Sequence, residues 1–140
     1  MQGIDGGAGA CKIYTPRSTM NLADQTAGFA FDGTVTAIGG SHSLTNPYGE
    51  GHRVATATFA VHHWYRAGTG KGEPTITIEV PIDDSIDPGP PPFQVGTRLL
   101  VSGSAGGARS VDRDGWLAYG CGFTRYYDPV TAQQWADAAR

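Results

Sequence analysis

Hydrophobic and polar residues alternate along much of the chain with the two-residue period of β-strands. In the first such run, Phe29, Phe31 and Val35 fall on one face. Asp32 and Thr34 fall on the other. Because consecutive side chains of a strand point to opposite sides of a sheet, the run predicts a strand with one buried face. Further strands are predicted at residues 53–65, 75–80, 98–102 and 116–121, and residues 39–51 are expected to form a long polar loop.

The run from Arg53 to Tyr65 is the longest of these predicted strands. Its alternation places Phe59, His63 and Tyr65 on one face. His62 and Trp64 then lie on the opposite face. We therefore expect His63 to be partly buried and His62 to be exposed beside threonines, so that the two histidines cannot share one metal ion.

Helices are expected at both ends of this strand-rich region. A short one ends at Gly28, with Ser18 or Asn21 as its cap. Near the end of the chain, Asp128 is a natural cap for a helix whose first residue is Pro129.

Five predicted strands and one or two short helices indicate a small closed β-barrel. Gly33, inside the first strand, fits this prediction because small barrels need a bulge or sharp bend for closure. A length of 140 residues suits one domain with a sizeable core. We assign residues 11–140 to that domain and the Gly-rich residues 1–10 to a flexible leader.

The charge and hydropathy of the chain argue against some classes of function. The formal net charge is −3, so the chain lacks the basic footprint of a nucleic-acid-binding protein. No apolar run approaches the 18 or so residues of a membrane-spanning helix, and no signal peptide is recognisable. If the protein is exported, this chain is expected to be its mature part. The eight arginines against two lysines are typical of GC-rich genomes such as those of actinobacteria.

The two cysteines, Cys11 and Cys121, flank nearly all of the patterned sequence. A disulfide between them would staple the domain and imply an oxidising compartment. Two unrelated buried thiols explain the same count, because free cysteine packs as a small hydrophobe. Cysteine number alone leaves both alternatives open.

Several motifs occur in an order that resembles a known superfamily. They are Cys11 with Pro16, Phe31–Val35 (FDGTV), Phe59–Gly68 (FAVHHWYRAG), Pro92–Val101 (PFQVGTRLLV) and Cys121–Arg125 (CGFTR). This order resembles bacterial members of the superfamily that includes the tissue inhibitors of metalloproteinases and the netrin modules. The resemblance covers about residues 11–126 and implies a five-stranded Greek-key OB-fold barrel in a secreted or cell-surface protein.

The resemblance also implies that Cys11 and Cys121 are bonded. One family mechanism is not carried over, namely chelation of a catalytic zinc by a free N-terminal cysteine. Ten residues precede Cys11 here, and Ile13 stands where a second early cysteine would be. Because bacterial members offer no established activity to transfer, the resemblance says more about fold than about function.

Metal-ligating residues occur in two expected loops. His42 and His52 flank one of them, and Asp83, Asp84 and Asp87 lie in the other. Oxygen ligands of that kind suit calcium, but the acidic loop lacks the length and terminal glutamate of an EF-hand. Turn chemistry explains the aspartates adequately, so we predict no resident metal and no cofactor.

Two segments resemble catalytic or phosphate-binding motifs, but neither matches its pattern. The segment Ser102–Gly106 (SGSAG) misses a nucleophile elbow and is interpreted as a hairpin loop, and Gly68–Gly72 (GTGKG) lacks the spacing of a phosphate-binding loop. We therefore expect a protein that is not an enzyme. The alternative is a small extracellular hydrolase or metal-binding protein that uses the loop histidines and aspartates.

Aromatic residues form the more plausible functional surface. The candidate ligand-binding residues are Trp64, Trp116, Tyr126 and Tyr127. Aromatic rings on the exposed face of an OB barrel can stack on ligands. In the competing interpretation, Tyr65, Tyr119 and Trp135 plug the barrel and dock the last helix. We thus expect a monomeric, secreted or cell-surface binding module for a protein or glycan.

Overall fold

The computed structural model describes residues 15–26, 28–45, 51–68, 72–81, 93–105, 116–118 and 124–140. Within these residues the chain forms six strands and two helices. In chain order they are α1 (Pro16–Thr26), β1 (Phe29–Thr45), β2 (Gly51–Arg66), β3 (Thr75–Pro81), β4 (Arg98–Ala105), β5 (Trp116–Ala118), β6 (Arg125–Tyr126) and α2 (Pro129–Ala139). The predictions of a mainly β protein and of a C-terminal helix are confirmed.

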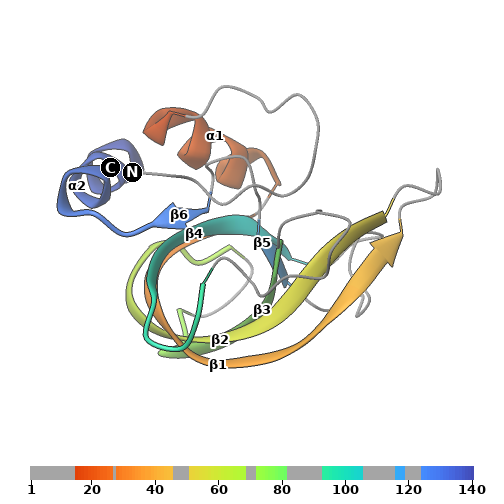
Figure 1. The fold of residues 1–140 in the computed structure, drawn as a ribbon. Helices are drawn as coiled ribbons and strands as arrows, with labels where there is room; N and C mark the ends of the chain where they lie inside the picture. Colours follow the sequence, from red (N-terminus) through yellow and green to blue (C-terminus); the bar gives the residue numbers. More distant parts are fainter. Residues whose placement is uncertain are drawn as a thin grey trace.

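The strands belong to one strongly curled sheet (Figure 1). Its order is β1-β2-β3-β5-β4-β6, and β1 also pairs with β4. All of these pairings are antiparallel except that of β3 with β5, which is parallel and joins Glu79 to Leu117. The short strand β6 lies beside the start of β4, with Tyr126 opposite Leu99.

The polar loop expected at residues 39–51 is a wrong prediction for residues 39–45 and 51, and residues 46–50 lie outside the described ranges. β1 continues to Thr45 and β2 begins at Gly51, so the two strands form a long hairpin that projects from the rest of the sheet (Figure 1). A register shift at Gly39 and Gly40 interrupts the ladder before it resumes at Ser41. Strand pairing there depends on backbone hydrogen bonds, which do not require alternating side chains.

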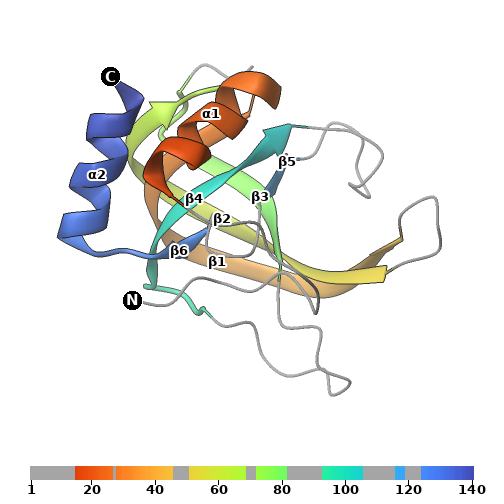
Figure 2. The same ribbon diagram turned by 90° about the horizontal axis from the view of Figure 1, so that it is seen from above.

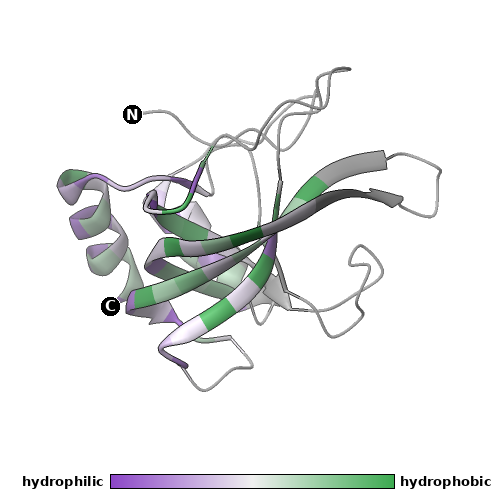
Figure 3. Cartoon of the chain, turned by 60° about the horizontal axis from the view of Figure 1, so that its bottom comes forward, coloured by the Kyte–Doolittle hydropathy of each residue, from purple (hydrophilic) through white to green (hydrophobic). Residues whose placement is uncertain are grey.

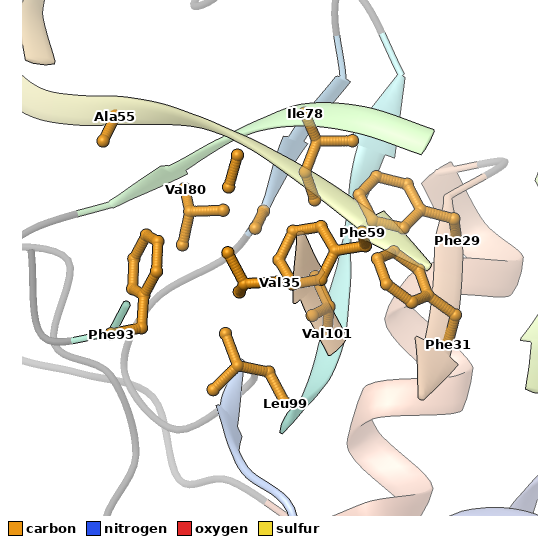
Figure 4. Close-up of a cluster of buried hydrophobic side chains, with 12 residues drawn as sticks. Phe29, Phe31, Val35, Ala55, Phe59, Ile78, Val80, Phe93, Leu99 and Val101 are labelled. Atoms are coloured by element: carbon orange, nitrogen blue, oxygen red, sulfur yellow. The ribbon is translucent and has the colours of Figure 1, made fainter. Parts of the chain in front are cut away.

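The inner side of the curled sheet holds the larger hydrophobic core (Figure 4). The rings of Phe31 and Phe59 lie 5.3 Å apart in an edge-on arrangement within it. The buried members are Phe29, Phe31, Val35, Ala55, Ala57, Phe59, Ile78, Val80, Phe93, Leu99, Val101 and Ala118. They come from five strands and from the turn before β4, and the apolar bands along the strands in Figure 3 mark the alternation that produces this core.

Both helices pack on the outer side of the sheet: α1 contacts β4 and β1, and α2 contacts α1 and β2 (Figures 1 and 2). A second buried cluster joins them to the sheet and contains Met20, Ala30, Leu100 and Trp135. Trp135 of α2 is completely buried. Aromatic side chains contribute much of the free energy of such packing because each buries a large apolar area.

The N-terminal caps of the two helices test the predicted capping residues. At α2 the prediction is confirmed: Asp128 accepts hydrogen bonds from the backbone amides of Val130 and Thr131. At α1 the predicted cap is wrong, since the helix begins at Pro16. Thr15 caps it instead, because its hydroxyl accepts from the Ser18 amide at 2.9 Å. The Ser18 hydroxyl in turn accepts from the Thr15 amide, which makes a reciprocal capping box.

Several predictions fall on residues outside the described ranges. They concern the leader at residues 1–10, both cysteines, the acidic loop at residues 83–87 and Tyr119. Among the described residues, neither helix is long and apolar enough to cross a membrane.

Candidate functional site

An uncovered polar surface lies on the outer side of β1, β2 and β3, away from the helices. It is formed by six threonines, two from each strand, which we call the threonine face: Thr34, Thr36, Thr56, Thr58, Thr75 and Thr77. Each pair follows the pattern Thr-x-Thr, with the residue between them directed toward the core. None of these positions carries a charge, and three of the six are well exposed in the described structure.

Cross-strand hydrogen bonds hold the threonine face in place. The hydroxyls of Thr58 and Thr77 lie 2.9 Å apart on paired strands. Thr36 donates its hydroxyl to the carbonyl oxygen of Thr58 at 3.2 Å. These hydroxyls bond to neighbours on the same surface, and their methyl groups remain on it. The result is a hydroxyl-rich surface that is able to exchange hydrogen bonds with a partner. The acidic residue on the same face, Glu79 opposite Thr56, is buried.

A β-bulge at His62 closes one end of this face. In the ladder, Asp32 pairs with His63 and Gly33 pairs with Val61, so His62 is an extra residue without an opposite number. Trp64 and Val61 both pack against the inner core, although an unbroken strand would place them on opposite faces. The bulge resets the alternation between them.

The bulge overturns the predicted faces of β2. His62 and His63 both lie on the outer side and both are exposed. The Nε2 atom of His62 lies 2.7 Å from the hydroxyl of Thr34, and the ring of His63 packs edge-on at 4.7 Å from that of Tyr65. The exposed position of His62 beside a threonine is confirmed. The partial burial of His63 and the assignment of the two histidines to opposite faces are wrong.

Gly33 lies beside the bulge in a position that has no room for a side chain. A Cβ atom at this position would come within 2.9 Å of the Phe31 ring and 3.1 Å of the Ala60 carbonyl oxygen. No larger residue fits without displacing the core. A bulge or sharp bend was predicted at Gly33; a register shift does fall between Asp32 and Gly33, but the extra residue is His62 of the partner strand.

The neighbouring, helix-covered surface is held by ionic and aromatic contacts. Arg98 donates two hydrogen bonds to the carboxylate of Asp32, at 2.8 and 2.6 Å. Its guanidinium also lies over the ring of Tyr127, 3.7 Å from the centroid. The Asp32 side chain is only 6% exposed, so this bidentate pair removes the penalty of a buried, unpaired carboxylate.

Charge and burial around this pair shift two protonation equilibria. Hydrogen bonding to Asp32 raises the pKa of Arg98 above its ordinary value. Burial, together with the negative charge of Asp32, raises the pKa of Tyr65 to about 12. The Tyr65 hydroxyl donates to the Ala132 carbonyl, and its ring packs edge-on against Trp135 at 5.7 Å. The predicted docking of the last helix by Tyr65 and Trp135 is confirmed.

Arg66, at the end of β2, ties the two helices together. Its Nε donates to Asp24 of α1 at 2.8 Å. Its NH1 group donates to the Ala139 carbonyl at the end of α2 at 2.7 Å. A cation at the C-terminal end of a helix satisfies a carbonyl that the helix leaves unpaired.

The aromatic ligand-binding candidates do not gather on one surface in the described structure. Trp64 and Tyr126 pack against the inner core and are half-buried. The indole of Trp64 donates to the Glu73 carbonyl at 2.8 Å. Tyr127 belongs to the helix-side cluster instead. Trp116 begins β5, and its side chain lies outside the described part.

The residues considered as metal ligands in the first loop, and the segment considered as a catalytic motif, lie on strands. His42 and His52 belong to the β1–β2 hairpin, where they pair with Val54 and Leu44. Among the described residues, no group of three histidine, cysteine, aspartate or glutamate side chains lies close enough to hold a metal ion. The segment expected to form a loop after Ser102 continues as β4 up to Ala105, which corrects that prediction.

The motifs that carry the family resemblance fall on regular elements. The segment FDGTV lies within β1, and most of FAVHHWYRAG lies within β2. The threonine that precedes β6, Thr124, bonds through its hydroxyl to the Ser102 carbonyl of β4. Comparison with models of known protein families and with curated proteins finds no match.

Sequence reasoning missed the Asp32–Arg98 pair and the two contacts of Arg66. Asp32 gave a signal, because it is the one charged residue within a run of small and apolar residues at the start of a strand. Its partner is 66 positions away, and nothing local identifies it. The three Thr-x-Thr pairs were visible, but only strand pairing brings them together.

Proposed function

We propose that this protein is a non-enzymatic binding module that recognises a partner protein through the threonine face. The observation that carries the proposal is a hydroxyl-rich sheet surface whose threonines are not part of the cluster that joins the described helices to the sheet. The inner side of the sheet, in contrast, is filled by buried side chains. A chain that leaves an ordered surface bare beside a full core is suited to recognition more than to catalysis.

A protein partner fits this surface better than a glycan. Glycan recognition commonly uses aromatic rings, and those placed by the described structure are engaged elsewhere: Trp64 on the core, and Tyr65 and Tyr127 beneath the helices. Threonine offers methyl groups for packing and hydroxyls for hydrogen bonds at a low entropic cost, since β-branched side chains are already restricted.

We further propose that the sheet is a Greek-key OB-fold barrel of the metalloproteinase-inhibitor and netrin superfamily. The ring of pairings β1-β2-β3-β5-β4-β1 supports this topology. The proposal includes the Cys11–Cys121 disulfide and a secreted or cell-surface location. Two contacts favour the disulfide: α1, which follows Cys11 closely, contacts β4, and Thr124, which follows Cys121, is bonded to Ser102 of β4.

Affinity capture from the proteins secreted by the native organism tests the binding function. The bait is the full chain, compared with Thr75→Lys/Thr77→Lys, which places two charges on the threonine face. Gln134→Lys, on an exposed position of α2, is the matched control. A partner retained by wild type and Gln134→Lys but lost with the double variant supports the proposal. A partner retained by all three proteins, or a glycan that binds all three equally, contradicts it.

The disulfide has a separate test. The intact mass of air-oxidised protein should rise by two hydrogens on reduction. Two thiols that react with an alkylating agent before reduction would refute the staple without bearing on the threonine face.

A further inference from the structure

The exposed histidines at the β2 bulge form a chemical group that the binding function does not use. His62 and His63 are consecutive, yet both lie on the outer side of the sheet. Side chains of consecutive strand residues normally point apart, so an unbroken strand never offers two imidazoles to one ligand. Here the extra residue re-aims the chain and brings the two rings to the same surface.

Each ring is held by a neighbour that leaves nitrogen available. The Nε2 atom of His62 lies 2.7 Å from the Thr34 hydroxyl. When Nε2–H donates to that oxygen, the lone pair of Nδ1 is free for a ligand. Metal-binding histidines are typically oriented in this way, with the other ring N–H donated to an oxygen. His63 is oriented by its edge-on contact with Tyr65.

The electrostatic surroundings do not oppose a cation. Asp32, the ladder partner of His63, carries a negative charge, and Arg98, which is bonded to Asp32, carries a positive charge. Their charges compensate each other. The adjoining threonine face contributes none.

We propose that His62 and His63 together bind one divalent transition-metal ion at the bulge, with Cu²⁺ bound more tightly than Ni²⁺ or Zn²⁺. Imidazole nitrogen suits these three ions, and the order follows their general affinity for nitrogen ligands. Because no three metal-ligating side chains gather in the described part of the chain, two protein ligands are available and water takes the remaining positions. This inference is independent of the partner proposed above.

Calorimetric titration of the full chain with CuCl₂, NiCl₂ and ZnCl₂ tests the site, with the cysteines oxidised or alkylated so that thiols do not compete. We expect one Cu²⁺ per chain. His62→Gln and His63→Gln should each weaken binding at least tenfold, because each removes half of the chelate. The double variant His42→Gln/His52→Gln is the matched control, since it removes two other histidines of the same sheet and should bind as wild type does.

Variants of Thr34 distinguish a specific metal site from an unspecific effect of changing the surface. Thr34→Val removes the hydroxyl that orients His62 and should weaken Cu²⁺ binding by about 10-fold. Thr34→Ser keeps a hydroxyl and should restore it. Three results overturn the proposal: no Cu²⁺ binding by the wild type, undiminished binding by both single histidine variants, or loss of binding in the His42/His52 control.

Discussion

The outer surface of the sheet has two regions, one covered by helices and one left uncovered by them. Near the start of β1 and β4, two helices cover it with buried Met20 and Trp135, and the ion pairs Arg66–Asp24 and Arg98–Asp32 border the contact. On β1, β2 and β3 farther along, the surface carries uncharged threonines whose hydroxyls bond to one another. The covered region contributes buried packing to stability, and the bare region is the surface that we propose for a partner.

Substitutions in the covered region should therefore affect folding, and substitutions in the bare region should affect the proposed binding. Replacing a side chain that fills space between helix and sheet with a smaller one leaves a cavity and lowers the free energy of unfolding. A threonine on an exposed strand is replaced at little cost, because its contribution to stability is small. The two regions should therefore separate cleanly when stability and binding are measured on the same variants.

Trp135→Ala should produce the largest loss of stability, about 3–5 kcal/mol in the free energy of unfolding, because it empties a fully buried site between α2 and the sheet. Urea denaturation followed by circular dichroism measures it. Thr77→Ala, on the threonine face, should change the same quantity by no more than about 0.5 kcal/mol. Comparable losses in the two variants would contradict the division of the surface.

Arg98→Met should be the next most damaging change, at about 2 kcal/mol, because it leaves the buried carboxylate of Asp32 without its partner. Adding Asp32→Asn to this variant should recover part of the loss, since the second change removes the orphaned charge. A double-mutant cycle measures this coupling. If the two losses simply add, the ion pair has no role in joining β1 to β4.

Tyr65 should make the covered region sensitive to high pH. Its pKa is raised from 10.0 to about 12, chiefly by burial, so folding favours the neutral phenol. This contribution to stability is fully present below pH 10 and is lost as the pH rises through about 12. Denaturation midpoints between pH 9 and 12 should fall more steeply for the wild type than for Tyr65→Phe. Equal slopes would show that Tyr65 is not the group responsible.

Asp128 should give the smallest effect, confined to acid. The Thr131 hydroxyl, and then the backbone amides of Val130 and Thr131, lower the pKa of Asp128 below 3.8. The contribution of the cap is present above that pH and is lost as the pH falls through the lower, folded-state pKa. Asp128→Asn keeps a capping oxygen without a charge, so the acid-dependent part of its stability should be absent. An unchanged acid profile in that variant would exclude the carboxylate.

The sequence predicted those parts of the fold that rest on local patterns. The starts of β1 and β3, the core alternation around Phe59 and the α2 cap at Asp128 each follow from neighbouring residues. The extension of β1 and β2 into the Gly39–Gly51 region was missed, because its ladder is made by backbone groups and shows no side-chain period. The two-residue strand β6 is too short to leave a pattern at all.

The surfaces that we propose for binding were predicted less well, for a related reason. Aromatic residues were the natural candidates, yet Trp64 and Tyr126 pack on the core once strand pairing is known. The threonine face needs three strands aligned in register, and the histidine pair needs a bulge. Register and bulges depend on contacts between distant residues, so periodicity within one segment cannot reveal them.

The bulge at His62 also divides β2 into two stretches, in which side chains of opposite numbering parity face the inner core. Before it, odd-numbered residues such as Phe59 and Val61 serve the inner core; after it, the even-numbered Trp64 takes that place and Tyr65 is directed to the helices. Deleting the single residue His62 would therefore remove the bulge and leave plain alternation, with Val61 inward, His63 outward and Trp64 inward. The indole would stay in the core and the phenol toward the helices, so this is a residue that both layers of the protein could lose without exchanging their aromatic rings.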